Sequence, residues 1–250
     1  MKQLTTQLPE FAPILHFATV DSTQSALAEH LTQNRGRPGH WHLAIADEQL
    51  AGRGRTGARW HAQAGDAVLM TLAAPLLLPL DKWPRASLVA GLAAAEALGD
   101  GVRLKWPNDL FVLQNGWKKL GGILCERLET PHGPWWLCGI GVNVRQVPGQ
   151  VREHAAALQP AQDRVDVAVR LARHIRQRID SFVMQQGQLP LAEIHARLAF
   201  CGMQVTLQDG LHGELQGLAE DGGLRVGGQV VRAGSIVRAA GENPWNAPAK

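Results

Sequence analysis

Glycine and arginine alternate between residues 52 and 59, where each type occurs three times within eight positions. Gly52 and Gly54 let the backbone wrap closely around a ligand. Arg53 and Arg55 present rigid forks of N–H donors to a phosphate or a carboxylate. The stretch follows neither a helical nor a strand period, so it predicts a loop. It is not a Walker A loop, because no Gly-Lys-Ser/Thr follows it. An anion-binding loop and a solvated basic loop without a ligand are both consistent with it.

The second segment that could do chemistry is Arg-Leu-Lys-Trp-Pro-Asn-Asp at residues 103–109. Pro107 forces the preceding residue toward extended geometry, and Asn108-Asp109 is a natural turn whose side chains can point into a site. Lys105 adds a cation just before this turn. The alternative is a plain hairpin corner with a core tryptophan.

Two further segments place glycines inside strands. Lys119 precedes a Gly-Gly pair that ends at Gly122, as expected for a cation beside a closely approached ligand. A surface lysine at the start of a strand is the alternative. In Gly-Ile-Gly-Val-Asn-Val, at residues 139–144, the glycines indicate close approach of a neighbour or a ligand. Asn143 would then be a buried polar group that needs partners. Simple strand packing explains this segment equally well.

The elements that must position these segments alternate between strands and helices. Hairpin signals such as Asn115-Gly116 favour a mostly antiparallel sheet with flanking helices, so we expect an α+β fold. Beyond residue 200, short β-like pieces alternate with Gly-rich turns, which is typical of a small β-barrel. We therefore expect a catalytic domain over residues 1–200 and a small C-terminal β-barrel domain over residues 201–250. The expected helices span residues 26–31, 85–98, 163–184 and 191–200, and the expected strands of the large sheet span residues 14–20, 41–46, 68–74, 102–106, 110–113, 122–128 and 135–144.

Composition narrows the class of protein. The chain has 250 residues, and its 45% hydrophobic content suits a sizeable core. A net charge of +3 over this length is too weak to indicate a nucleic-acid partner, and small anions fit better. The three cysteines, Cys125, Cys138 and Cys201, form no disulfide or zinc pattern. With no signal peptide and no long apolar run, the sequence predicts a cytoplasmic protein that does not enter a membrane.

Taken together and in this order, the segments resemble biotin protein ligases. The family's Asp-Ser-Thr-Asn start is matched by Asp-Ser-Thr-Gln at 21–24, and its Gly-Arg-Gly-Arg-Arg-Gly-Arg-x-Trp loop by residues 52–60. Its Lys-Trp-Pro-Asn-Asp, Lys-Leu-x-Gly-Ile-Leu and Gly-x-Gly-x-Asn motifs are matched as well. The resemblance covers about residues 16 to 240. Thr56 and Ala58 depart from it by replacing arginines, and residues 234–238 match only loosely.

The resemblance implies a class II synthetase-like catalytic domain with an SH3-like C-terminal barrel. It also implies an enzyme that makes biotinyl-5′-adenylate from biotin and Mg·ATP and then transfers biotin to a carrier lysine. Biotin-binding residues would be Ser22, Thr23, Gln49, Gly52, Arg53, Gly54, Lys119 and Gly122. Residues that bind ATP or the adenylate would be Arg55, Trp60, Lys105, Asn108 and Asn143. The catalytic groups would be Arg53, Arg55, Lys119 and Asp109.

Asp109 has several possible roles under this resemblance. It could accept the proton of the attacking lysine or orient that lysine, and it could instead bind Mg²⁺ or pair with Lys105. The expected partner is a biotin carboxyl carrier protein or domain of an acyl-CoA carboxylase, and a homodimer is possible. The sequence begins almost at the catalytic domain, so we expect no helix-turn-helix and no DNA partner.

Two rival functions remain. A lipoate or octanoate ligase or transferase would have a similar catalytic domain but would lack the Gly-Arg-Gly-Arg loop with Lys-Trp-Pro-Asn-Asp. A biotin sensor without catalysis would keep the biotin-binding residues and could lose the catalytic cation, whereas Lys119 is present here. A nucleic-acid binder is disfavoured because the aromatic residues lie mostly at expected core positions rather than among the basic ones.

Overall fold

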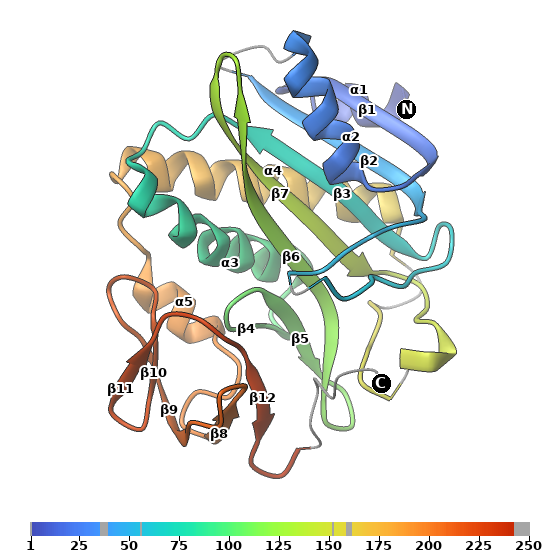
Figure 1. The fold of residues 1–250 in the computed structure, drawn as a ribbon. Coiled ribbons are helices and arrows are strands. Elements are labelled where there is room, and N and C mark those ends of the chain that lie inside the picture. Colours follow the sequence, from blue (N-terminus) through green and yellow to red (C-terminus); the bar gives the residue numbers. More distant parts are fainter. Residues whose placement is uncertain (1, 36–39, 56, 152, 159–161, 243–250) are drawn as a thin grey trace.

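The computed structural model describes residues 2–35, 40–55, 57–151, 153–158 and 162–242. Thr56, one of the two residues that replace an arginine of the family pattern, lies outside these residues. A seven-stranded sheet in the order β1-β2-β3-β7-β6-β5-β4 forms the centre of the molecule (Figure 1). β1 and β2 are parallel, and the other neighbours are antiparallel. The strands are β1 (Phe11–Val20), β2 (Trp41–Gln49), β3 (Ala67–Ala74), β4 (Val102–Lys105), β5 (Asp109–Leu113), β6 (Trp117–Thr130) and β7 (Gly133–Asn143).

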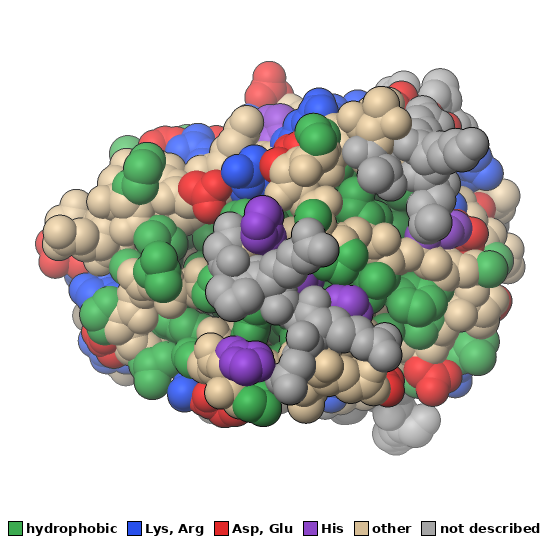
Figure 2. Space-filling model, turned by 90° about the horizontal axis from the view of Figure 1, so that it is seen from above, with side chains coloured by type: hydrophobic (Ala, Val, Ile, Leu, Met, Phe, Trp, Pro, Cys, Tyr) green, Lys and Arg blue, Asp and Glu red, His purple; other side chains and the backbone are tan. Residues whose placement is uncertain are grey.

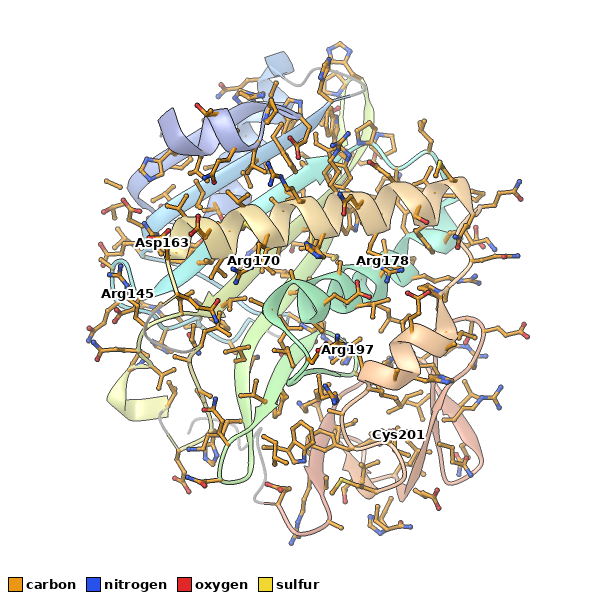
Figure 3. All side chains as sticks on the ribbon, turned by 180° about the vertical axis from the view of Figure 1, so that it is seen from behind. Arg145, Asp163, Arg170, Arg178, Arg197 and Cys201 are labelled. Atoms are coloured by element: carbon orange, nitrogen blue, oxygen red, sulfur yellow. The ribbon has the colours of Figure 1, made fainter. Side chains whose placement is uncertain are left out.

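Helices cover the two faces of this sheet unequally. α3 and α4 pack against one face, as the view from behind shows (Figure 3). α2 packs against the other face through Leu27, which meets Ala73 and Leu137, and leaves the rest of that face to loops. The helices are α1 (Lys2–Gln7), α2 (Thr23–His30), α3 (Ala86–Leu98), α4 (Arg164–Met184) and α5 (Leu191–Arg197), with short helical turns η1 (Leu31–Arg35), η2 (Leu80–Arg85) and η3 (Gly149–Val151).

Local sequence explains the two long helices. α3 is rich in alanine and leucine and is buried almost all round, because the sheet, α4 and apolar side chains of the C-terminal region surround it. α4 is amphipathic, and its buried side chains recur at helical spacing. Asp163 caps it by accepting hydrogen bonds from the backbone N–H groups of Val165 (2.7 Å) and Asp166 (3.2 Å).

The C-terminal strands form a second sheet, five-stranded and antiparallel, in the order β11-β10-β9-β8-β12. Its core includes residues from the region of the first sheet, because Trp106 and Phe111 pack in the same cluster as its apolar side chains. Trp106 Nε1 also donates to the carbonyl of Gly222 at 3.1 Å. The strands are β8 (Gln204–Leu207), β9 (His212–Leu218), β10 (Leu224–Val226), β11 (Gln229–Val231) and β12 (Ile236–Ala239).

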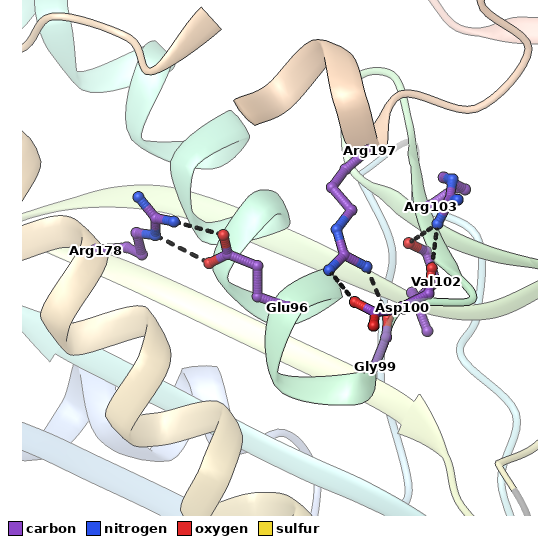
Figure 4. Close-up of polar contacts among 7 residues, drawn as sticks. All are labelled: Glu96, Gly99, Asp100, Val102, Arg103, Arg178 and Arg197. Carbon is purple, nitrogen blue, oxygen red and sulfur yellow. Dashed lines mark hydrogen bonds and ion pairs between the residues drawn. The ribbon is translucent and has the colours of Figure 1, made fainter. Parts of the chain in front are cut away.

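Arginine clamps hold α5, and with it the second sheet, against the first. Arg178 of α4 pairs with Glu96 of α3 and with Glu193 of α5. Arg197 donates to the carbonyl of Gly99 and pairs with Asp100 (Figure 4). Charge elsewhere is dispersed: seen from the end where α2 lies, Lys and Arg side chains sit in small groups among acidic and hydrophobic ones (Figure 2).

The predicted α+β class with a mostly antiparallel sheet and a C-terminal β domain is confirmed. The division at residue 200 stays a prediction. α1 was not expected, and β6 begins at Trp117 rather than at Gly122. Among the described residues, no helix combines the length and the apolar character needed to cross a membrane.

Candidate functional site

The candidate site lies on the sheet face that α3 and α4 leave uncovered. In the middle of this face, Gly122 pairs with Gly141 and Leu124 pairs with Gly139. Because glycine has no side chain, the backbone is not covered by side chains of its own at these glycines, and we call this part of the sheet the glycine floor. Neighbouring side chains fill the space above the two glycines of β7. A β-carbon on Gly141 would lie 2.7 Å from the ring of Trp60, and one on Gly139 would overlap the carboxamide of Gln24. Close approach of side chains therefore explains the glycines of residues 139–144.

Lys105, Asp109 and Lys119 meet at one edge of the floor. The β4–β5 hairpin pairs Lys105 with Asp109, and β5 pairs Asp109 with Gly122. The Asp109 carboxylate binds Lys119 Nζ at 2.6 Å and Lys105 Nζ at 3.2 Å. The Lys105 side chain is fully buried, whereas that of Lys119 is 38% exposed. The sequence predicted each of these three residues, and the structure brings them together.

The electrostatics of this centre follow from burial and pairing. Burial alone would raise the pKa of Asp109, but the ammonium groups of Lys119 and Lys105 outweigh it and hold that pKa below its usual range. Burial lowers the pKa of Lys105, and the attraction of Asp109 opposes this only in part. One carboxylate between two lysines leaves a net positive charge beside the glycine floor, which suits an anionic ligand.

Two asparagines of the predicted set lie near this centre. Asn108 Nδ2 donates to the carbonyl of Ile123 at 2.7 Å and so fixes the turn between β4 and β5 onto β6. Asn143 Nδ2 donates to the carbonyl of Ala156 at 3.0 Å. Asn143 Oδ1 is buried, and no donor among the described residues reaches it. A buried acceptor without a partner is uncommon and fits a ligand that supplies a hydroxyl or amide donor.

A hydrogen-bonded group at the start of α2 forms the polar end of the site. Ser22 caps the helix, its Oγ accepting from the backbone N–H groups of Gln24 and Ser25. Gln49 Oε1 accepts from the backbone N–H of Thr23 at 2.8 Å and from its hydroxyl at 2.9 Å. That hydroxyl also shares a hydrogen bond of 2.9 Å with Thr71. Sequence reasoning missed Thr71, although it is the one polar residue within β3.

The basic loop is a tight hairpin. Arg53 and Arg59 form an antiparallel bridge, Gly54 N–H donates to the carbonyl of Ala58, and Trp60 N–H donates to the carbonyl of Gly52. The predicted loop is therefore present. Its remaining cation, Arg55, donates through Nη2 to the carbonyl of Gly234 in the C-terminal region, at 2.6 Å.

Arg53 makes a different contact. Its Nη2 lies 3.0 Å from Oε2 of Glu126, which also accepts from Gln24 Nε2 at 2.6 Å. Glu126 and Gln24 were not among the predicted site residues. A signal existed for Glu126, because it lies four positions after Gly122 and therefore on the same face of β6. All three side chains line a cavity of about 590 Å³, whose wall also includes Ser25, Ala28, Arg127, Leu128 and Leu137.

The Trp60 ring joins the two ends of the site. It covers Gly141, and the ammonium of Lys119 lies 5.9 Å from its centroid. The structure thus sorts the predicted residues into three neighbourhoods: the polar end at α2, the lysine–carboxylate centre, and the hairpin that carries Trp60. Arg53 and Arg55 lie on the hairpin, and the contacts just described bind them to Glu126 and Gly234.

Comparisons with known proteins agree with this arrangement. The profile of the Biotin/lipoate A/B protein ligase family matches residues 16–143. The chain is 35% identical over 215 residues to biotin–[acetyl-CoA-carboxylase] ligase of Mycobacterium tuberculosis, covering 78% of both chains. It is 36% identical over 165 residues to the bifunctional ligase/repressor BirA of Bacillus subtilis, covering 62% of this chain and 49% of that protein. The chain thus matches about half the length of BirA.

A solved structure is similar over most of the chain. Biotin protein ligase from Aquifex aeolicus, in complex with biotin and ATP, superposes with a TM-score of 0.71 and 27% sequence identity. The superposition covers 86% of this chain and 92% of that one. The similarity therefore extends beyond residues 16–143 to most of the chain.

Proposed function

The chain belongs to the biotin/lipoate A/B protein ligase family, and on that premise we propose that it is an ATP-dependent biotin protein ligase. It joins biotin to the α-phosphate of ATP, giving biotinyl-5′-adenylate and pyrophosphate. A lysine of a carrier protein then attacks the acyl carbon and releases AMP. The names of the relatives support biotin as the acid and an acetyl-CoA carboxylase carrier as the acceptor.

One observation carries the proposal. The lysine–carboxylate centre, with its excess positive charge, lies on the same face of the sheet as the hydrogen-bonded group at the start of α2. The first step must bring together two anions, the biotin carboxylate and the triphosphate, so it requires fixed positive charge more than proton transfer. Lys119 meets this need, because Asp109 holds its ammonium at 2.6 Å while 38% of the side chain stays exposed.

The polar end suits the ureido head of biotin. A ureido group offers a carbonyl acceptor and two N–H donors, and hydroxyls and a carboxamide supply both kinds of partner. Ser22, Thr23 and Gln49 provide these groups. Thr23 and Gln49 are hydrogen-bonded to each other, and Ser22 Oγ accepts from the backbone N–H of Gln24, so the orientation of all three is fixed. A site built in this way rejects an alkyl acid, which would leave the polar groups unpaired.

The adenylate is proposed to lie between the lysine centre and Trp60. Asn143 Oδ1, which lacks a donor among the described residues, fits a ribose hydroxyl. Asn108 is already bonded to the backbone of β6, so its proposed role is to hold the turn that carries Asp109. Lys105 is fully buried and forms an ion pair with Asp109, so its proposed effect on the adenylate is electrostatic and is exerted through that pair.

Magnesium is proposed to arrive with ATP. Among the described residues, no group of three or more His, Cys, Asp or Glu side chains could hold a metal ion. The Asp109 carboxylate is already bound by two ammonium groups. These residues therefore do not fit a metal held by the protein alone, and they leave the phosphates of ATP as its ligands.

In the second step, Asp109 is proposed to orient the acceptor lysine rather than to deprotonate it. A carboxylate whose pKa lies below its usual range is a weak proton acceptor near neutral pH. The ion pairs that lower its pKa also fix its position. The three free cysteines fit the reducing cytoplasm in which we place the reaction.

The test is adenylate formation without a carrier. The purified protein is incubated with Mg·ATP and biotin, with lipoate and octanoate in parallel, and the acyl-adenylate is measured by mass spectrometry. We expect biotinyl-adenylate from biotin alone. An adenylate of lipoate or octanoate instead would move the protein to the lipoate branch of the family, and binding of biotin with no adenylate would make it a sensor.

A further inference from the structure

Side chains from two other elements converge on one carboxylate oxygen of β6. Glu126 of β6 accepts at Oε2 from Gln24 of α2, at 2.6 Å, and from Arg53 of the basic loop, at 3.0 Å. Glu126 lies opposite Leu137 in the β6–β7 ladder, away from the Lys105–Asp109–Lys119 centre at the other end of the floor. The group therefore forms a second polar centre, on the wall of the 590 Å³ cavity.

Both donors are held in place independently of Glu126. Gln24 is 4% exposed, and its carboxamide lies so close to Gly139 that no β-carbon would fit there. Arg53 forms the base of the hairpin through its backbone bridge with Arg59. A bond from the Arg53 side chain to β6 therefore fixes the base of the hairpin relative to the sheet, and with it Trp60, whose N–H is bonded to the carbonyl of Gly52.

We infer that Glu126 is a positioning residue that anchors the basic loop, and that Arg53 serves as the loop's side of this anchor rather than as a charge on the reacting phosphate. The inference rests on the proposed function for its kinetic consequences only. It assigns phosphate neutralisation to Lys119 and Arg55 and leaves Arg53 to hold the loop over the ligand.

The expected size of the effect follows from exposure. The ion pair alone is weak, because the Arg53 and Glu126 side chains are 51% and 36% exposed. The bond from the buried Gln24 amide to a carboxylate is charge-assisted and adds to it. Loss of the anchor should therefore change loop opening by a factor of about five to ten, with little effect on the fold.

Limited trypsin digestion tests the anchor without any activity. The loop carries cleavage sites after Arg55 and Arg59. Glu126→Gln should raise the rate of cleavage at these sites about five- to tenfold, because cleavage of a fast-opening loop follows the population of its open form. Glu129→Gln is the matched control: Glu129 lies on the same strand, is 62% exposed and pairs with Arg127. Cleavage at equal rates in the two variants would overturn the anchor.

A double-mutant cycle in adenylation separates anchoring from catalysis. If Arg53 acts through Glu126, then Arg53→Gln and Glu126→Gln should each raise the KM for biotin about fivefold with kcat nearly unchanged, and the double variant should resemble either single one. If Arg53 instead neutralises the phosphate, Arg53→Gln should lower kcat strongly whether or not Glu126 is present. That second result would overturn the inference.

The two assays keep this inference distinct from the proposed function. If the unmodified protein forms no biotinyl-adenylate, the proposed function fails, and trypsin still decides on the anchor. If the adenylate forms but Glu126→Gln behaves like Glu129→Gln in digestion and in KM, the anchor fails and the proposed function stands.

Discussion

Replacing Asp109 by asparagine removes the carboxylate that lies between two lysines, and its consequences can be worked out from the structure. Asparagine keeps the size of the side chain and one acceptor oxygen but not the charge. Lys105, whose side chain has no exposed surface, then faces a neutral amide at the position from which Asp109 bound its Nζ at 3.2 Å. Lys119 is 38% exposed, so solvent can take over much of the role of its carboxylate partner.

The size of the stability loss is set by Lys105, the buried partner of Asp109. Removing one member of a buried ion pair typically costs about 3–5 kcal/mol, because the remaining charge stays out of water. We expect about 3 kcal/mol of lost stability for Asp109→Asn, since deprotonation of Lys105 limits the penalty. For a chain of this length that corresponds to a fall in Tm of roughly 6–12 °C.

The assay is unfolding followed by tryptophan fluorescence, made in two backgrounds. In Lys105→Met the buried ammonium is gone and an unbranched apolar side chain fills its place. Asp109→Asn should then cost only about 1 kcal/mol, close to the value of one hydrogen bond. An equal cost of Asp109→Asn in both backgrounds would refute the reasoning, because the loss would not arise from the buried charge.

The pH dependence of this deficit has a defined sign. The folded pKa of Asp109 is lowered, so its stabilising effect is present at neutral pH and is lost as the pH falls below about 4. In the variant, the pKa of Lys105 falls further below its ordinary value, and the penalty for its charge in the folded state disappears as the pH rises toward that ordinary value. The deficit should therefore be largest near neutral pH and should narrow toward pH 3 and toward pH 10. A deficit that stays constant across this range would contradict the assignment.

Three further predictions follow from other parts of the structure. Lys119→Ala and Arg55→Ala should each slow formation of the adenylate by about 100-fold or more in a pre-steady-state assay, as is usual when a preorganised charge is removed, and near-normal rates would contradict their roles. Trp106→Phe should cost about 1–3 kcal/mol in urea unfolding, because it leaves the buried carbonyl of Gly222, between β9 and β10, without its donor. A thiol reagent should label the exposed Cys201 quickly and the buried Cys138 only on unfolding, since burial raises the pKa of the Cys138 thiol. Rapid labelling of Cys138 in the folded protein would show that the sheet is more open than described.

Much of the large sheet could be predicted from turn chemistry and periodicity. Asn115-Gly116 predicted a hairpin, and both residues have the positive φ angles, 51° and 97°, that such a turn needs. The start of β6 was placed five residues too late, because the Gly-Gly pair before Ile123 weakens a strand pattern. Those glycines belong to the strand all the same, since β5 and β7 pair with them on both sides. α1 was missed because six residues without a clear apolar period carry too little signal.

The contact between Asp109 and Lys119 could not be predicted from spacing. In a regular strand, residues 119 and 122 point to opposite faces, because side chains alternate with a period of two. The observed register pairs Gly122 with Asp109 but Lys119 with Phe111, so three steps along β6 match two steps along β5. This irregularity turns Lys119 to the face that carries Asp109. The sequence names both residues, yet only the paired strands show that they meet.

The positions of the charges suggest a division of labour within the proposed site. The cation of the sheet, Lys119, is fixed by a carboxylate that is itself held by a fully buried lysine, so it is preorganised before any ligand arrives. The loop cation Arg55 differs, because its contact with the Gly234 carbonyl is exposed and costs little to break. Arg55 can exchange the Gly234 carbonyl for a phosphate, whereas Arg53 would have to give up a carboxylate. Charge that must be in place for chemistry therefore lies on the sheet, and charge that must move toward a ligand lies on the hairpin.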